Sequence, residues 1–171
     1  LHDEYFRKAK AEGYLARSAY KLIEINDRKR LIAKGNRVLD LGCAPGSWLQ
    51  VAARLVGPKG RVVGIDLKPV VADLGPQVVT LVGDLTRTDA AALTAPVGSR
   101  YDAVISDMAP NTTGAGDDFR SVHLCRDVLA ILPGVLRFGG NLAMKVLEGA
   151  EYPPLLRETA ALFTTARGLK P

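Results

Sequence analysis

Five short apolar runs alternate with longer segments along most of this sequence, and this alternation limits what the chain can fold into. The runs have the length of buried strands, and the segments between them are long enough for helices. The runs cover residues 38–41, 61–65, 78–82, 101–105 and 141–147. Strands that alternate with helices predict an α/β domain with a mostly parallel central sheet and helices on both of its faces.

The segments between the runs predict helices at residues 15–33, 47–56, 87–94, 118–137 and 152–162. Gly139 and Gly140 are typical of the end of the fourth helix, because glycine often follows the last helical residue. Residues 111–118 (NTTGAGDD) predict a loop, since glycines and side chains that favour turns dominate them. Residues 163–169 could form a sixth strand.

Length and composition are those of an ordinary globular chain, with 171 residues and 47% apolar residues. We therefore expect a single domain and a monomer. No apolar stretch approaches the roughly 18 residues of a membrane span and no cleavable leader is visible, which indicates a cytoplasmic protein without membrane contact. Cys43 and Cys125 are too few for a disulfide framework, and no Cys/His cluster has the spacing of metal ligands, so no metal is expected.

Positive charge is concentrated at the start of the chain. Residues 1–37 hold ten Lys/Arg and five Asp/Glu, whereas residues 38–171 hold thirteen of each, so the net charge of +5 belongs to the first segment. We call residues 1–37 the N-terminal basic segment and expect it to be a helical part of the same domain as the core, residues 38–171. Its cationic side chains would attract a polyanion such as RNA, and a solvated helix face is the alternative. The residues expected to bind RNA are Arg17, Lys21, Arg28, Lys29 and Arg30.

The first apolar run leads into a glycine-containing turn, within the stretch LDLGCAPGSW at residues 39–48. Glycine lets backbone approach a ligand closely, and the following helix offers free N–H groups, which is typical of a nucleotide site. The dinucleotide pattern GxGxxG is missing, because three residues separate Gly42 from Gly46, and Pro45 has no N–H for a phosphate. The turn therefore suits a ligand other than a pyrophosphate.

An aspartate closely follows each of three apolar runs, at Asp66, Asp84 and Asp107. Ligands of an open α/β sheet bind beyond the carboxyl ends of its strands, so these carboxylates should border one crevice with the glycine turn. Asp66 lies 24 residues after Gly42, a spacing at which an acidic residue accepts hydrogen bonds from a ribose. Asp84 could accept a hydrogen bond from an adenine amino group. Helix capping is the alternative for each aspartate.

Lys145 lies within the apolar stretch NLAMKVL, in a run that we interpret as a buried strand. An unpaired charge is costly there, and a lysine that is partly neutral can remove a proton. The alternatives are a lysine that reaches outward to solvent and an ion pair with Asp107 on a neighbouring strand. Lys21 follows the stretch YLARSAY, and helical periodicity leaves open whether it points to solvent or into the crevice.

Six motifs occur in a fixed order along nearly the whole chain. They are ARSAYKL at residues 16–22, LDLGCAPGSW at 39–48, GIDL at 64–67, GDL at 83–85, SDMAPN at 106–111 and MKVL at 144–147. In this combination the sequence resembles the FtsJ/RrmJ (RlmE) family of ribosomal RNA methyltransferases. The resemblance implies a Rossmann-like fold and S-adenosyl-L-methionine as the methyl donor. It also implies methylation of a ribose 2′-hydroxyl, on a uridine of large-subunit (23S-type) ribosomal RNA within the large ribosomal subunit.

The resemblance also implies roles for single residues. The methyl-donor site would be lined by Gly42, Gly46, Trp48, Asp66, Asp84 and Asp107. Asp66 would contact the ribose of the donor and Asp84 its adenine. The family's catalytic tetrad is Lys, Asp, Lys, Glu, and its first three members match Lys21, Asp107 and Lys145. We interpret Lys145 as the base that takes the ribose proton, Asp107 as its orienting partner, and Lys21 as the group that positions ribose or phosphate.

The glutamate of that tetrad has no counterpart before Lys170 and Pro171. In the family, a Lys-Pro pair is followed by a segment of the type SRxxSxE, so we expect the C-terminal end to be truncated. Three other functions stay open at this point. They are a transfer RNA 2′-O-methyltransferase, a non-catalytic RNA-binding ribosome assembly factor with the same fold, and an NAD-dependent oxidoreductase, which only the strand, turn and Asp66 support.

Overall fold

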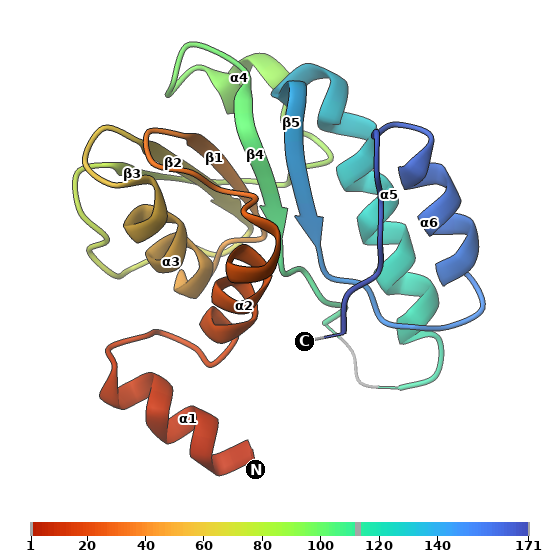
Figure 1. Cartoon of the computed structure of the whole chain (residues 1–171), viewed down its shortest axis with the longest axis horizontal. Helices are drawn as coiled ribbons and strands as arrows, with labels where there is room; N and C mark the ends of the chain where they lie inside the picture. The colour runs from red at the N-terminus through yellow and green to blue at the C-terminus, as the bar shows by residue number, and fades with distance from the viewer. Residues whose placement is uncertain (1, 112–113, 171) are drawn as a thin grey trace.

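The centre of the computed structural model, which describes residues 2–111 and 114–170, is a five-stranded sheet. Its strands all run parallel, in the order β3-β2-β1-β4-β5 (Figure 1). The strands are β1 (Arg37–Leu41), β2 (Arg61–Asp66), β3 (Val78–Val82), β4 (Tyr101–Ser106) and β5 (Leu136–Met144). The parallel sheet predicted from the alternating apolar runs is confirmed.

The carboxyl ends of four strands are aligned across the sheet. Leu41 of β1 lies opposite Ile65 of β2 and Ser106 of β4. Ser106 in turn lies opposite Met144, the last residue of β5. The residues that follow these strands therefore share one edge of the sheet, where open α/β folds bind their ligands.

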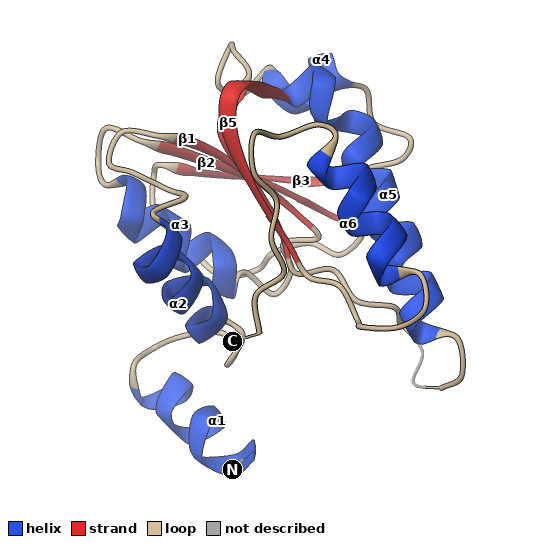
Figure 2. Ribbon diagram, turned by 45° about the vertical axis from the view of Figure 1, so that its right-hand side comes forward, coloured by secondary structure: helices blue, strands red, loops and turns tan. Residues whose placement is uncertain are grey.

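Helices cover both faces of the sheet (Figure 2). They are α1 (His2–Ala11), α2 (Ala19–Lys29), α3 (Ser47–Val56), α4 (Ala90–Thr94), α5 (Asp117–Val135) and α6 (Tyr152–Ala160). One apolar cluster, which includes Leu22 and Leu49, joins α2 and α3 to one face. A second cluster, which includes Leu93 and Val128, joins α4, α5 and α6 to the other face. Burial of these side chains is the main force that holds the layers together, whereas α1 projects away from the sheet (Figures 1 and 2).

Helix α2 is shorter than the helix predicted at residues 15–33. It ends at Lys29, because Arg30 adopts a left-handed conformation with φ of 53°. The buried side chain of Asn26 then accepts a hydrogen bond from the backbone N–H of Ile32 at 2.9 Å. This contact holds the turn that leads the chain into β1. A side-chain contact six residues ahead is invisible to helical periodicity.

The boundary between α5 and β5 also differs from the one predicted from the sequence. We expected a helix to residue 137, a glycine stop at Gly139 and Gly140, and a strand at 141–147. The helix instead ends at Val135, and β5 begins with the next residue. The two glycines lie inside β5, where its register with β4 is irregular, and Gly139 has a φ of 74°. Glycines occur at irregular positions of strands as well as after helices, so the glycine pair does not distinguish the two.

Residues 163–169 do not form the sixth strand that the sequence suggested. After α6 they run back across the open side of β5, and the described part of this segment makes no backbone hydrogen bond with β5. A cavity lies between the two, so the segment is too far away to pair. An apolar run predicts an extended chain, but it does not say whether a neighbouring strand is within hydrogen-bonding distance.

The remaining expectations differ in detail. The helix predicted at 87–94 forms only at Ala90–Thr94, because the carboxylate of Asp89 caps it by accepting from the N–H of Ala92 at 2.7 Å. The helix predicted at 47–56 is confirmed. Of the loop predicted at 111–118, Thr112 and Thr113 lie outside the described residues. In the described part of the chain, no helix has both the length and the apolar character that a membrane span needs.

Candidate active site

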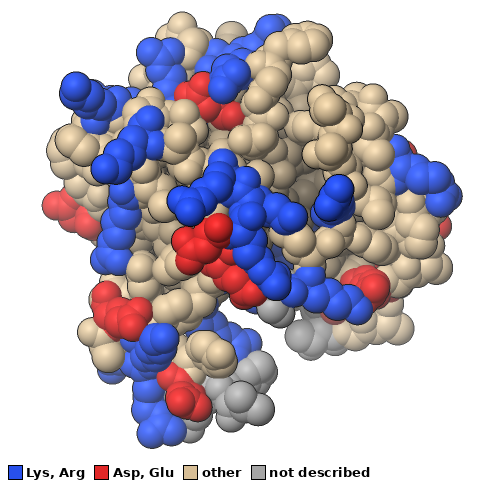
Figure 3. Space-filling model, in the orientation of Figure 1, with Lys and Arg blue, Asp and Glu red and all other residues tan. Residues whose placement is uncertain are grey.

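A cavity of about 1040 Å³ opens beside the carboxyl ends of β4 and β5. Its lining brings together Lys21 from the first turn of α2, Asp107 directly after β4 and Lys145 directly after β5. Trp48 of α3 also lines it, and residues 163–170 form the opposite wall. Lys and Arg side chains surround a hollow near the middle of this face (Figure 3). Residues that are far apart in sequence therefore meet at the edge predicted for a ligand site.

Lys145 and Asp107 form the ion pair that the sequence left as an alternative. The Nζ atom of Lys145 lies 3.2 Å from Oδ1 of Asp107 and also donates a hydrogen bond to the backbone carbonyl of Asp107 at 3.2 Å. The two side chains are 26% and 19% exposed, so the amine is half-buried and still reachable from the cavity. The backbone N–H of Lys145 donates to the carbonyl of Ser106 at 2.8 Å, which fixes the position of the lysine relative to β4.

Lys21 faces the same cavity, which settles the orientation that periodicity left open. Contacts between α3 and the residues before α2 hold it there. The indole N–H of Trp48 donates to the carbonyl of Ser18 at 2.9 Å, and the hydroxyls of Ser18 and Ser47 are 2.8 Å apart. Trp48 is therefore both a wall of the cavity and an anchor for the start of α2.

The glycine turn after β1 requires its glycines. Gly42 has a φ of 78°, and a Cβ atom there would lie 2.1 Å from Cγ of Met108. Gly46 has a φ of 121° and stands at the start of α3 without a side-chain cap. The N–H groups of Gly42 and Cys43 both donate to the carbonyl of Ile65, which ties the turn to β2. The first N–H groups of α3 are thus presented beside the turn.

Asp66 contacts this turn, and neither Asp66 nor Asp84 lines the cavity. Asp66 accepts hydrogen bonds from the N–H of Ala44 at 3.0 Å and from the N–H of Lys68 at 2.8 Å, so it braces the turn. Asp84 accepts from the N–H and the hydroxyl of Thr86, and these bonds lower the pKa of its carboxyl group. Neither residue caps a helix. Both accept hydrogen bonds within local turns, which is neither the helix cap nor the ligand contact that the sequence suggested.

Asp40 is a functional candidate that the sequence analysis missed. It lies in β1 with 1% of its surface exposed, and neither carboxylate oxygen has a hydrogen-bond partner among the described residues. Burial, together with the nearby carboxylates of Asp107 and Asp66, raises the pKa of Asp40 well above its usual range. The signal was present in the sequence, since an aspartate inside the apolar run VLDLG is as unusual as Lys145 within its own run.

The cationic residues expected to bind RNA are mostly on the surface. Arg28, Lys29 and Arg30 are exposed at the end of α2, where Arg28 pairs with Glu24 at 3.3 Å. Lys29 also lines the cavity, together with Lys21. The end of α2 is therefore continuous with the cavity. Arg17 is exposed as well.

A parallel sheet with helices on both faces and a glycine turn after its first strand defines a Rossmann-like α/β protein. The chain belongs to the FtsJ-like methyltransferase family, whose profile matches residues 14–171. It is thus a methyltransferase, as the motifs indicated, and this membership argues against the NAD-dependent alternative.

Individual relatives agree with this assignment. The chain is 50% identical over 171 residues to ribosomal RNA large subunit methyltransferase E of Desulforapulum autotrophicum, an alignment that covers 99% of this chain and 84% of the relative. It is 45% identical over 173 residues to the protein of the same name from Syntrophobacter fumaroxidans, covering 100% and 88%. The crystal structure of a ribosomal RNA methyltransferase from Plasmodium falciparum is similar with a TM-score of 0.83 and 27% identity, over 92% of this chain and 91% of that chain.

Proposed function

We propose that this chain transfers a methyl group from S-adenosyl-L-methionine to a ribose 2′-hydroxyl of large-subunit ribosomal RNA, on a uridine. The observation that carries the proposal is the pair of Lys145 and Asp107, which faces a cavity together with Lys21. The names of the relatives support a ribosomal RNA substrate. A cation-rich surface beside the cavity also suits an RNA.

The residues around the glycine turn fit a methyl donor that carries positive charge. Asp40 has two buried oxygens without a hydrogen-bond partner among the described residues. A carboxylate that lacks a partner favours a cationic ligand. The residues proposed to hold the donor are Gly42, Gly46, Trp48, Asp66, Asp84 and Asp107, with Asp40 in addition.

When bound, S-adenosyl-L-methionine supplies a methyl group on a sulfonium sulfur, which departs as a neutral thioether. Lys145 accepts the proton of the ribose 2′-hydroxyl at Nζ as the oxygen bonds to the methyl carbon. Asp107 orients that amine through the 3.2 Å contact. RNA that covers the cavity excludes water from the reacting atoms. Lys21 holds the ribose or its phosphate in line, and most of the rate gain is expected from this alignment.

The proposal is tested with Lys145→Ala, measured as labelled methyl transfer to undermethylated large ribosomal subunits. Loss of a general base slows a reaction by about 100-fold or more, so we expect transfer to fall by at least that factor. Titration calorimetry should show unchanged binding of S-adenosyl-L-methionine, and Lys59→Ala is the matched control at an exposed turn.

Unchanged transfer by Lys145→Ala, with donor binding intact, would remove Lys145 from the mechanism. Transfer to transfer RNA but not to large subunits would favour the transfer RNA alternative. No transfer to either RNA, with RNA binding retained, would favour the assembly factor.

A further inference from the structure

The amino ends of four strands carry a row of arginines, at the end of the sheet opposite the candidate active site. Arg37 begins β1 and lies opposite Arg61, which begins β2. Arg100 directly precedes β4, and Arg137 is the second residue of β5. All four side chains are exposed. β1 and β4 are in register at Val38 and Ala103, so Arg100 lies two residues beyond the position level with Arg37. The four arginines therefore lie near the same end of the sheet, on the neighbouring strands β2, β1, β4 and β5.

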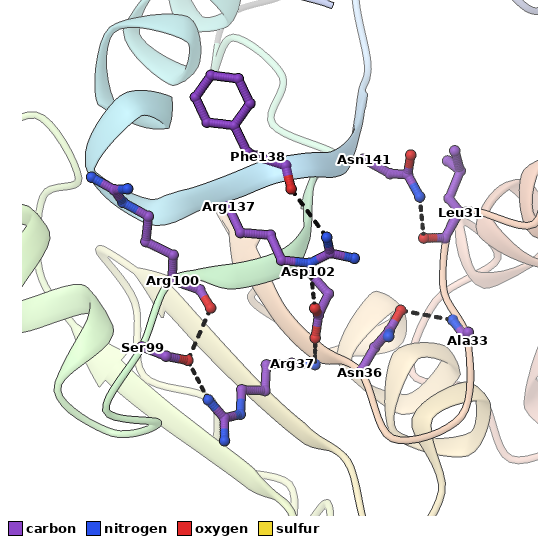
Figure 4. A network of polar contacts seen from close by, with 10 residues as sticks. All are labelled: Leu31, Ala33, Asn36, Arg37, Ser99, Arg100, Asp102, Arg137, Phe138 and Asn141. Atoms are coloured by element: carbon purple, nitrogen blue, oxygen red, sulfur yellow. Dashed lines mark hydrogen bonds and ion pairs between the residues drawn. The ribbon is translucent and has the colours of Figure 1, made fainter.

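A polar network holds the row in place (Figure 4). The carboxylate of Asp102 accepts from the Nε–H of Arg137 at 2.6 Å and from the backbone N–H of Arg37 at 2.7 Å. The guanidinium group of Arg37 also donates to the hydroxyl of Ser99, which in turn donates to the carbonyl of Arg100 at 3.0 Å. Asp102 thus fixes the starts of β1 and β5 relative to β4.

The network leaves the row strongly positive. Four arginines against the single aspartate give a formal charge of +3. Within the described residues, Arg137 forms the ion pair with Asp102, and no ion pair involves the other three arginines. The guanidinium of Arg100 points away from the contacts around Asp102 (Figure 4). Such a row attracts a polyanion.

An aromatic ring stands beside this charge. Phe138 is 100% exposed, because the irregular start of β5 turns residues 137–140 outward. Its carbonyl accepts a hydrogen bond from the guanidinium of Arg137 at 3.0 Å, so the backbone under the ring is anchored. In Figure 4 the ring points away from the network. A fully exposed phenylalanine among arginines suits an unpaired nucleobase, since bases stack on aromatic rings and phosphates bind guanidinium groups.

The row is connected to the candidate active site. Lys21 and Lys29, at the two ends of α2, both line the cavity, and the rise along α2 between them is about 12 Å. After α2, the carbonyl of Leu31 accepts from the side chain of Asn141 in β5 at 2.9 Å, so the chain passes next to β5 on its way to Arg37. Figure 3 shows Lys and Arg side chains both near the hollow and over the upper part of the same face.

We infer that the arginine row, defined as Arg37, Arg61, Arg100 and Arg137 with Phe138, is a second RNA-binding surface. It rests on the proposed function, because it assigns an additional contact to the same substrate. RNA that flanks the target nucleotide leaves the cavity along α2, places its phosphates on the arginines and stacks an unpaired base on Phe138. Counting charges along the sequence cannot reveal this surface, since three of its arginines belong to the part of the chain with no net charge.

The test compares two doubly substituted chains that lose the same charge. Arg61→Gln with Arg100→Gln removes two members of the row, and Arg87→Gln with Arg157→Gln removes two exposed arginines elsewhere. The probe is a transcript of large-subunit ribosomal RNA, and the dissociation constant is measured between low and moderate salt. Each lost phosphate contact lowers the slope of log K against log salt by about 0.7 to 0.9. The slope for the row variant should therefore be smaller by about 1.4 to 1.8, and its binding at low salt should be roughly tenfold weaker.

Phe138 is tested separately, because stacking and charge respond differently to salt. Phe138→Leu should weaken binding roughly fivefold or more without changing the slope, and Phe138→Tyr should restore it. A row variant that matches its control in both affinity and slope would overturn the inference, as would equal binding by the leucine and tyrosine variants. Methyl transfer by the unaltered chain is followed separately on undermethylated large ribosomal subunits, so its absence there would count against the proposed function and not against the surface.

Discussion

At the scale of single residues, Asp40 shows that the site is not built for stability. A buried carboxyl group with two unpartnered oxygens is costly to keep charged. Asp66 and Asp107 raise that cost, because their carboxylates lie close enough to disfavour a second negative charge. A cationic methyl donor would offset this cost. Asp40 therefore lowers the stability of the protein without a ligand and favours a positively charged ligand.

We predict that Asp40→Asn stabilises the protein at neutral pH. The pKa of Asp40 is raised in the folded state, so between the unfolded pKa near 3.9 and the folded pKa the unfolded chain is ionised while the folded chain holds a proton. Stability conferred by the neutral group is therefore present in acid and lost as the pH rises. The free energy of unfolding of Asp40→Asn should exceed that of the unaltered chain by about 1–3 kcal/mol at pH 7 and by much less at pH 4.

Urea denaturation at the two pH values measures this difference. Asp27→Asn, at an exposed position on α2, is the control and should show no such change with pH. A gain of equal size at both pH values would contradict the account of Asp40, and so would a loss at pH 7.

The pair of Lys145 and Asp107 was predictable from the sequence, whereas Asp40 was overlooked. Lys145 stood out as a charge in an apolar run, and Asp107 followed the neighbouring strand. The distance of 3.2 Å between Nζ of Lys145 and Oδ1 of Asp107 agrees with the expectation that side chains following neighbouring parallel strands lie close together. Asp40 had the same signal, but it sits before the turn and not after a strand end, so a search restricted to strand ends passes over it.

At the scale of elements, the glycine turn joins β1, β2 and β4. Its backbone N–H groups bond to Ile65, and the missing side chain of Gly42 makes room for Met108 directly after Asp107. Any atom added at Gly42 would push on the segment that carries Asp107. The turn therefore sets the position of Asp107, the residue that pairs with Lys145, relative to the proposed donor site.

We predict that Gly42→Ala destabilises the protein more than Gly116→Ala. Both glycines have positive φ, at 78° and 87°, so alanine strains the backbone at each by about 1–2 kcal/mol. At Gly116 nothing lies within 4 Å of the added Cβ, whereas at Gly42 it meets Met108. Overpacking should add about 1–3 kcal/mol to the loss at Gly42, measured by urea denaturation. Equal losses in the free energy of unfolding for the two variants would contradict the expected overpacking against Met108.

The order and type of the elements were predictable, but several of their ends were not. Alternating apolar runs were enough for the five strands and for the helices that follow them. The end of α2 depends on the side chain of Asn26, and the short α4 depends on the cap at Asp89. The start of β5 depends on an irregular pairing with β4. Each of these boundaries is set by a contact with a particular partner, which residue periodicity does not encode.

At the scale of the whole molecule, we propose different roles for the two ends of the sheet. The carboxyl end holds the glycine turn and the aspartates, and of these residues Asp107 lines the cavity together with Lys145. The amino end carries the arginine row and Phe138. Strand β4, with six residues, separates the two by about 20 Å. A large RNA can contact both ends at once, which a small metabolite cannot, and this agrees with a positive net charge of +5 on a chain of modest size.

The most direct test of the central claim is the position of the methyl group in the product. Undermethylated large ribosomal subunits are incubated with the protein and S-adenosyl-L-methionine, and the RNA is digested to nucleosides and analysed by mass spectrometry. We predict a gain of 2′-O-methyluridine that depends on both the protein and the methyl donor. A methyl group on a base, or no gain of methylated nucleoside by a protein that binds the donor, would contradict the account.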